Sequence, residues 1–212
     1  MNIIRRPFKY RNYNAVYWLI GINILIFAAA QLLGYNIRQS LTVRMAMIPV
    51  AVTQGWVWTF VTYMFMHGNI SHILFNMLGL FIFGIHVERQ MGSSEFILYY
   101  LVIGIFAGIF SFGVYYVTRN YWVALIGASG ALFAVQLAYA VFFPDSIIYI
   151  WGILPLRAPV MVLGFTALEL VFSITGSNSS VAHLTHLAGF GFGWIYFLLR
   201  FGMNPWRRLT GR

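Results

Sequence analysis

Long runs of apolar residues, hardly interrupted by charge, constrain the fold of this chain more than any other feature. A helix that crosses the hydrocarbon core of a bilayer needs about 20 such residues, and its backbone must satisfy its own hydrogen bonds. The runs here are too long for barrel strands. Only 8% of the residues are charged, against roughly a quarter in a soluble domain. The sequence therefore predicts an all-α membrane protein.

Six membrane-spanning helices are predicted, which divide the chain into a basic N-terminal segment, a six-span domain and a basic tail. The expected spans are roughly 14–34, 71–90, 95–117, 124–143, 156–175 and 181–201, within segments 1–13, 14–201 and 202–212. Between the first two spans lies a stretch rich in aromatic residues but broken by glycine and polar residues, which favours the membrane interface. We expect a half-submerged outer loop there, and a short interfacial excursion after the fourth span.

Basic residues gather on one predicted side of the membrane. An even number of spans places both termini, and the loops after spans two and four, on the same side. Ten basic residues fall there, against three on the other side, Arg38, Arg44 and Arg119. By the positive-inside rule, both termini are predicted to be cytoplasmic. The net charge of +9 is thus interpreted as a topology signal, not as a nucleic-acid-binding surface.

The first span resembles a signal peptide at one point, because Ala28 and Ala30 have the spacing of a signal-peptidase site. The apolar run continues past them and reaches spanning length, so we expect it to remain in the protein. The sequence contains no cysteine, which excludes disulfides, thiol nucleophiles and metals bound by cysteine.

Four polar residues from three predicted spans are expected at one depth. Ser129 lies about five residues into the fourth span, His186 about five into the sixth, and His72 and Asn76 about one and five into the second. At 1.5 Å per residue, all lie within roughly 10 Å of the outer boundary. Polar groups in hydrocarbon usually face the bundle interior or a watery cavity. We therefore expect a shared cavity that opens toward the outer face.

Small residues predict close packing between the fourth and sixth spans. His186 shares a helical face with Gly189 and Gly193, a GxxxG-type surface. The fourth span offers a complementary smooth stripe of Gly127, Ala131, Ala134 and Ala138. Such packing would bring His186 within reach of Ser129. On an ideal helix Ser129 projects away from the stripe, so the contact depends on the local backbone.

These residue types fit acyl-transfer chemistry. A histidine in contact with a serine can take its proton during nucleophilic attack, and His72, Asn76 and the Ser129 N–H fit as oxyanion donors. A triad would add a carboxylate. Three of the four acids are predicted at the cytoplasmic side, and Glu169 deep in span five. We therefore expect a dyad of Ser129 and His186, with Glu169 as a buried hydrogen-bonded acid.

Four stretches resemble, in order and spacing, the rhomboid intramembrane serine proteases. They read HGNISHILFN, VERQMGS, GASGALFA and HLTHLAGFGFG, and the resemblance covers nearly the whole six-span chain. It implies that Ser129 is the nucleophile of a GxSG motif and His186 the base of an HxxGxxxG motif. His72 and Asn76 would be the oxyanion-stabilising pair of an HxxxN motif.

The resemblance also implies a function. Members of that family cleave transmembrane segments of other proteins near the outer boundary, without metal or cofactor, and their proposed substrate route involves span five and a cap over the site. Two departures stand out. Thr59 follows Trp58 where many members have arginine, which puts the stability of the outer loop in question, and Ala188 replaces a glycine. We expect membrane-protein substrates, the lipid bilayer as surroundings, and a bacterial cell inner membrane; the sequence does not fix an oligomeric state.

Several alternatives compete with this reading. A small transporter would need polar residues along the whole pathway, and a non-cleaving rhomboid-like protein that binds membrane segments usually lacks the serine or histidine. His183 competes with His186 as the base, but the glycine spacing favours His186. Metal binding by this histidine pair is disfavoured because no HExxH motif or nearby carboxylate is evident. His67 and His86 are expected to serve structure or solvation.

Overall fold

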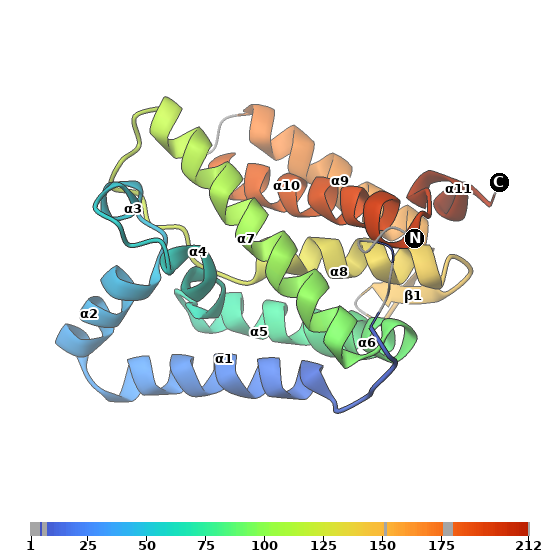
Figure 1. Cartoon of the computed structure of the whole chain (residues 1–212), viewed down its shortest axis with the longest axis horizontal. Coiled ribbons are helices and arrows are strands. Elements are labelled where there is room, and N and C mark those ends of the chain that lie inside the picture. Colours follow the sequence, from blue (N-terminus) through green and yellow to red (C-terminus); the bar gives the residue numbers. More distant parts are fainter. Residues whose placement is uncertain (1–4, 6–7, 151, 176–179, 212) are drawn as a thin grey trace.

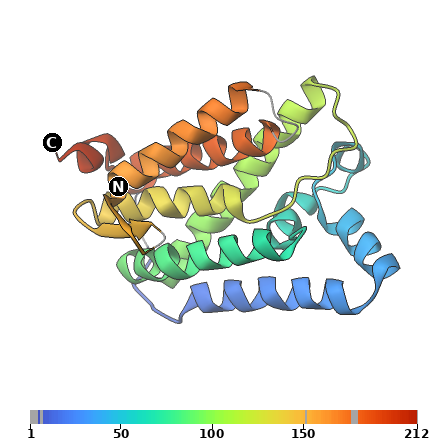
Figure 2. The same cartoon turned by 180° about the vertical axis from the view of Figure 1, so that it is seen from behind.

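The computed structural model describes residue 5 and residues 8–150, 152–175 and 180–211. Helices dominate it and mostly run side by side (Figures 1 and 2). In chain order, the elements are α1 (Ala15–Leu32), α2 (Tyr35–Met45), α3 (Pro49–Thr53), α4 (Thr59–Thr62), η2 (Tyr63–Phe65), α5 (Ile70–Gly79), η3 (Leu80–Gly84), α6 (Ile85–Met91), α7 (Ser93–Val117), α8 (Ser129–Phe142), β1 (Ile147–Ile150), β2 (Leu154–Arg157), α9 (Ala158–Thr175), α10 (Ser180–Tyr196), η4 (Phe197–Phe201) and α11 (Pro205–Thr210).

Within the described residues, four helical stretches are long and apolar enough to cross a membrane. They are α1, α7, α9 and the continuous stretch Ile70–Met91 formed by α5, η3 and α6. In that order, they correspond to the predicted spans one, three, five and two. The sixth predicted span corresponds to α10 and η4, and the count of six remains a prediction.

The fourth predicted span begins too early. The helix α8 starts at Ser129 and has 14 residues, a length of about 21 Å against roughly 30 Å of hydrocarbon. Residues 121–128 form a loop instead, and Leu125 pairs with Met47 in an isolated antiparallel bridge. Leu125 and Ala128 are buried, so this loop is as apolar as a helix and hydropathy does not separate the two.

The expected excursion after α8 is a β-hairpin, so the all-α prediction is wrong at this point. Strands β1 and β2 are antiparallel, with Ile147 opposite Arg157 and Ile150 opposite Leu154. Isoleucine, which is β-branched, occupies three of the four positions in β1 and favours a strand. Gly152 in the connection has a φ of +73°, a conformation that glycine adopts without strain.

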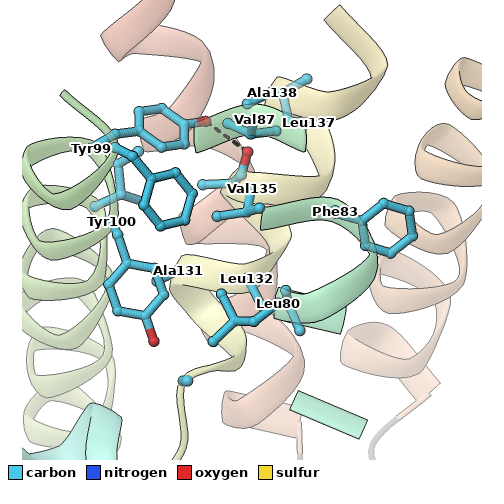
Figure 3. Packing of buried hydrophobic residues seen from close by; sticks show 14 of the residues in the cluster. Leu80, Phe83, Val87, Tyr99, Tyr100, Ala131, Leu132, Val135, Leu137 and Ala138 are labelled. Carbon is cyan, nitrogen blue, oxygen red and sulfur yellow. Dashed lines mark hydrogen bonds between the residues drawn. The ribbon is translucent and has the colours of Figure 1, made fainter. Parts of the chain in front are cut away.

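The helix α8 lies in the interior of the bundle, between α10, α7 and η3 (Figures 1 and 3). Its small residues Ala131, Ala134 and Ala138 are all buried, which lets neighbouring helices come close. Tyr99 of α7 donates a hydrogen bond of 2.6 Å from its hydroxyl to the carbonyl oxygen of Ala134 (Figure 3). The buried hydroxyl is thus satisfied by the α8 backbone.

A polar network holds the end of the molecule where both chain termini lie (Figure 1). The carboxylate of Glu88 accepts hydrogen bonds from the backbone N–H groups of Ala15 (2.6 Å) and Val16 (3.0 Å), and so caps the first turn of α1. Glu95 accepts two hydrogen bonds of 2.8 Å from the guanidinium of Arg200. These contacts join α6 to α1 and α7 to η4.

The segment between the first two spanning stretches forms α2, α3, α4 and η2 at the opposite end (Figure 1). Its Thr59, the departure noted in the sequence, is fully buried and donates its hydroxyl to the Trp56 carbonyl at 2.6 Å. Trp58 donates its indole N–H to the carbonyl oxygen of Arg44 at 3.0 Å, and its ring stacks on Trp56. Local bonds and ring stacking hold this loop where arginine is absent.

Candidate active site

Ser129 is the first residue of α8, and the backbone before it explains why. Gly127 has a φ of +111°, which disfavours any side chain there. A Cβ at Gly127 would also lie 2.5 Å from Nε2 of His72. The N–H of Gly127 donates to the carbonyl of Tyr63 at 2.9 Å. The turn therefore carries the chain into the bundle and starts the helix at the serine.

The structure brings His186 of α10 to Ser129. Nε2 of His186 lies 2.6 Å from the hydroxyl oxygen of Ser129, within hydrogen-bond distance. The contact is possible because Ser129 begins the helix, so the ideal-helix projection considered in the sequence does not apply.

Glycines on α10 set the spacing of the two helices. A Cβ at Gly189 would lie 1.9 Å from the carbonyl oxygen of Gly130, and one at Gly193 would lie 3.0 Å from the Cβ of Ala134. The predicted close packing of these two helices is present at both positions. At position 189, glycine is the residue that leaves room for the backbone of Gly130 next to Ser129.

Phe133 fixes the plane of the His186 ring, a role that the sequence analysis missed. The two rings are stacked, with centroids 4.7 Å apart and an angle of 7° between their planes. Phe133 lies four residues after Ser129 and therefore on the same face of α8. That spacing is the signal that would have identified it.

Glu169 of α9 lies beside the histidines, and the prediction that no carboxylate is near them is wrong. Its Oε1 is 3.1 Å from Nδ1 of His186, and its Oε2 is 2.6 Å from Nδ1 of His183. The contact to His186 is within ion-pair distance, but the ring N–H is not aligned on the oxygen as a hydrogen bond requires. A small rotation of either group would align it.

The membrane depth of Glu169 explains why the sequence did not place this residue beside the histidines. The predicted depths rest on spans two, four and six only, each counted inward from its outer end. Glu169 is six residues before the end of α9 at Thr175, which is about 9 Å along the axis. The same count from the other end of span five would have placed it level with Ser129.

His72 and Asn76 lie on α5, on the other side of the serine. The His72 ring rests against Gly127, as described above, and Asn76 lines the same cavity as Ser129. One N–H of the Asn76 side-chain amide donates to the carbonyl of His72 at 2.8 Å, and the amide oxygen is buried without a hydrogen-bond partner among the described residues. The amide carries a second N–H, which no hydrogen bond among the described residues uses.

His67 packs against His72, with ring centroids 5.0 Å apart. Burial lowers the pKa of His67 to about 4, and the neighbouring His72 ring adds to the effect. The ring of His67 is therefore neutral at physiological pH. The ring contact with His72 is compatible with the role in structure or solvation expected from the sequence, which stays a prediction.

A cavity of about 520 Å³ extends along α8 from Ser129 to β1. Residues of α5 and η3, such as Phe75 and Ile82, line one part of it, and residues of α9, such as Phe165 and Glu169, line another. Most of its walls are apolar side chains. The arrangement places the contact between the Ser129 hydroxyl and the His186 imidazole at one end of a mostly apolar cavity.

The chain matches known proteins over most of its length. The model of the Rhomboid domain matches residues 54–203. YdcA of Bacillus subtilis is 30% identical over 143 residues, which cover 66% of this chain and 67% of YdcA. Rhomboid protease AarA of Providencia stuartii is 28% identical over 66% of this chain and 54% of its own length. Rhomboid protease GluP of Bacillus subtilis is 36% identical over 118 residues, which cover 55% of this chain and 22% of GluP. The chain thus spans about half the length, or less, of several relatives.

Proposed function

This chain belongs to the rhomboid family, and from that premise we propose that it is an intramembrane serine endopeptidase whose nucleophile is Ser129. The observation that carries the proposal is the 2.6 Å contact between the Ser129 hydroxyl and Nε2 of His186, at the start of a recessed helix and at one end of an apolar groove. The names of AarA and GluP, which are rhomboid proteases, support the same activity.

The reaction follows from the two side chains. His186 takes the proton from Ser129 as the serine oxygen attacks the scissile carbonyl carbon, and it then gives that proton to the leaving amine. A water molecule, deprotonated by the same imidazole, hydrolyses the acyl-enzyme. The stacked Phe133 ring keeps the imidazole plane in place through these steps.

Glu169 extends the proposed dyad toward a triad. During the attack His186 becomes an imidazolium, and the Glu169 oxygen 3.1 Å from its Nδ1 is placed to stabilise that charge. The second carboxylate oxygen is held by His183, so the carboxylate is oriented from both sides. We assign Glu169 as a positioning residue for His186, and His183 as its support.

The oxyanion of the tetrahedral intermediate needs hydrogen-bond donors. The backbone N–H of Ser129 is at a helix N-terminus, where such groups have no intrahelical partner. His72 and Asn76 are on α5, and Asn76 has a second amide N–H to donate beside the one bonded to the His72 carbonyl. These three groups are the proposed oxyanion site.

The proposed substrates are transmembrane segments of other membrane proteins. The groove beside α8 is lined by apolar residues of α5, η3 and α9, and an apolar helix that lies in it would present its backbone to Ser129. The distribution of basic residues supports a six-span topology with cytoplasmic termini. The bacterial relatives support a location in a bacterial inner membrane.

The direct test is proteolysis by the purified protein in liposomes. Intact protein should cut a model transmembrane substrate and react with a fluorophosphonate probe, and both Ser129→Ala and His186→Ala should abolish the two signals. Cleavage that persists in a pure preparation of Ser129→Ala would refute the nucleophile. Ion or solute flux without probe labelling would support a transporter instead.

A further inference from the structure

The side chains of Glu169, His183 and His186 form a cluster whose ligand atoms all lie within 4.8 Å of one another. We propose that this cluster is an inhibitory binding site for a divalent transition metal ion of the zinc type. The inhibitory effect rests on the function proposed above, whereas the binding itself does not.

The geometry is close to that of a metal site. The Glu169 oxygens lie 2.6 Å and 3.1 Å from the Nδ1 atoms of His183 and His186. Zinc held at about 2.0–2.1 Å by two imidazoles and a carboxylate separates neighbouring ligand atoms by roughly 3.3 Å in a tetrahedral arrangement. These two contacts therefore need to widen by less than 1 Å, and a ligand pair at the 4.8 Å limit would need to close by roughly 1.5 Å, which side-chain rotation can provide.

The identity of the ligands selects the metal. Two imidazole nitrogens and one carboxylate suit zinc and similar transition ions, whereas magnesium prefers oxygen ligands and keeps most of its water. The histidine and glutamate side chains are 19% and 16% exposed, and Glu169 lines the cavity. An ion can therefore reach the cluster, with a fourth position left for water.

Metal binding at Nδ1 would remove the base. In the working enzyme Nδ1 of His186 carries the proton, and Nε2 is free to accept another from Ser129. A metal ion at Nδ1 displaces that proton to Nε2, which then donates a hydrogen bond to the Ser129 oxygen 2.6 Å away. Such a second partner for a metal-bound histidine is common. In this state His186 cannot accept the serine proton, so hydrolysis stops until the metal dissociates.

Binding is tested without catalysis in the full-length Ser129→Ala protein. Zn²⁺ should bind with one ion per chain by titration calorimetry, and Co²⁺ should give the visible absorption of a tetrahedral site. His183→Gln keeps a group that can bond to Glu169 but is a poor metal ligand, and it should weaken binding at least about tenfold. His86→Gln is the matched control, because His86 contacts the Ile82 carbonyl outside the cluster.

Inhibition is tested in the active protein. Zn²⁺ should reversibly inhibit cleavage, EDTA should restore it, and Mg²⁺ should have no effect. The concentration for half-inhibition, measured against each variant's own metal-free rate, should rise at least about tenfold in His183→Gln and stay unchanged in His86→Gln. It should also rise as the pH falls, because protons compete for the ligands. Equal zinc binding by the intact protein and His183→Gln would overturn the site. If the protein proves inactive, the calorimetry and the cobalt spectrum still decide the binding.

Discussion

The substitution Gly189→Ala tests the packing that brings the two reacting side chains together. The added Cβ would lie 1.9 Å from the carbonyl oxygen of Gly130, and real contacts of this kind are not shorter than 3.0 Å. The backbones of α8 and α10 must therefore separate locally by roughly 1 Å. Neither atom is at the end of a flexible side chain, so a rotamer change cannot relieve the clash.

The separation would act on the proposed catalytic contact, since Gly130 follows Ser129 and Gly189 is one turn from His186. A Ser129–His186 distance of 2.6 Å that grows by roughly 1 Å is no longer a hydrogen bond. A displacement of this size costs on the order of 100-fold in rate, and overpacking costs about 1–3 kcal/mol of stability. We expect kcat/KM to fall by about that factor.

The assay measures kcat/KM on a model transmembrane substrate in liposomes, together with the rate of fluorophosphonate labelling. Gly191→Ala is the control, because a Cβ there meets no atom within 4 Å and alanine favours a helix. Gly191→Ala should retain full activity. A kcat/KM of folded Gly189→Ala within about threefold of that of the unaltered protein would refute this prediction.

Three further predictions concern charged and buried groups. Glu169→Gln should lower kcat at least about tenfold with little change in KM, because the imidazolium loses its carboxylate; pre-steady-state kinetics of acylation measures this, and an unchanged rate contradicts the positioning role. Glu88→Gln should lower the free energy of unfolding by about 1–2 kcal/mol, because the carboxylate that caps α1 becomes a neutral amide; thermal unfolding in detergent checks this. The pKa of His67 is lowered by burial from 6.5 to about 4. The unfolded chain therefore binds more protons between these two pH values, and the free energy of unfolding decreases as the pH falls through that range. His67→Phe should lose less of its free energy of unfolding between pH 6.5 and 4 than the unaltered protein, and equal losses in the two proteins would contradict this prediction.

Much of the site was predictable because membrane depth and helical spacing are simple functions of residue number. The GxxxG face of α10 and the small residues of α8 predicted close packing of the two helices, which would bring His186 within reach of Ser129 if the backbone at Ser129 allowed it. Gly189 and Gly193 occupy the contacts that this spacing requires. A count of residues from the outer end of span five, which runs in the opposite direction, would have placed Glu169 at the same depth as Ser129.

Other features depend on tertiary structure and were not predictable from hydropathy. The second half of the loop before Ser129 is apolar because it is packed inside the protein, where Leu125 and Ala128 are buried and Leu125 pairs with Met47. An apolar loop and an apolar helix have the same mean hydropathy, so the predicted start of the fourth span came too early. The hairpin of β1 and β2 was missed for a similar reason, because a short apolar segment beside a membrane span carries no distinct period.

The position of Ser129 at the first turn of α8 has a consequence for which substrates fit. The groove is lined by residues of α8 from Ser129, the proposed nucleophile, to Gln136, and by β1. A substrate helix lying along the groove would follow α8 for about 10 Å, the length of some seven helical residues, between the severed bond and the hairpin. The distance from the cut to the hairpin would then limit how much of the substrate's apolar segment the groove can hold.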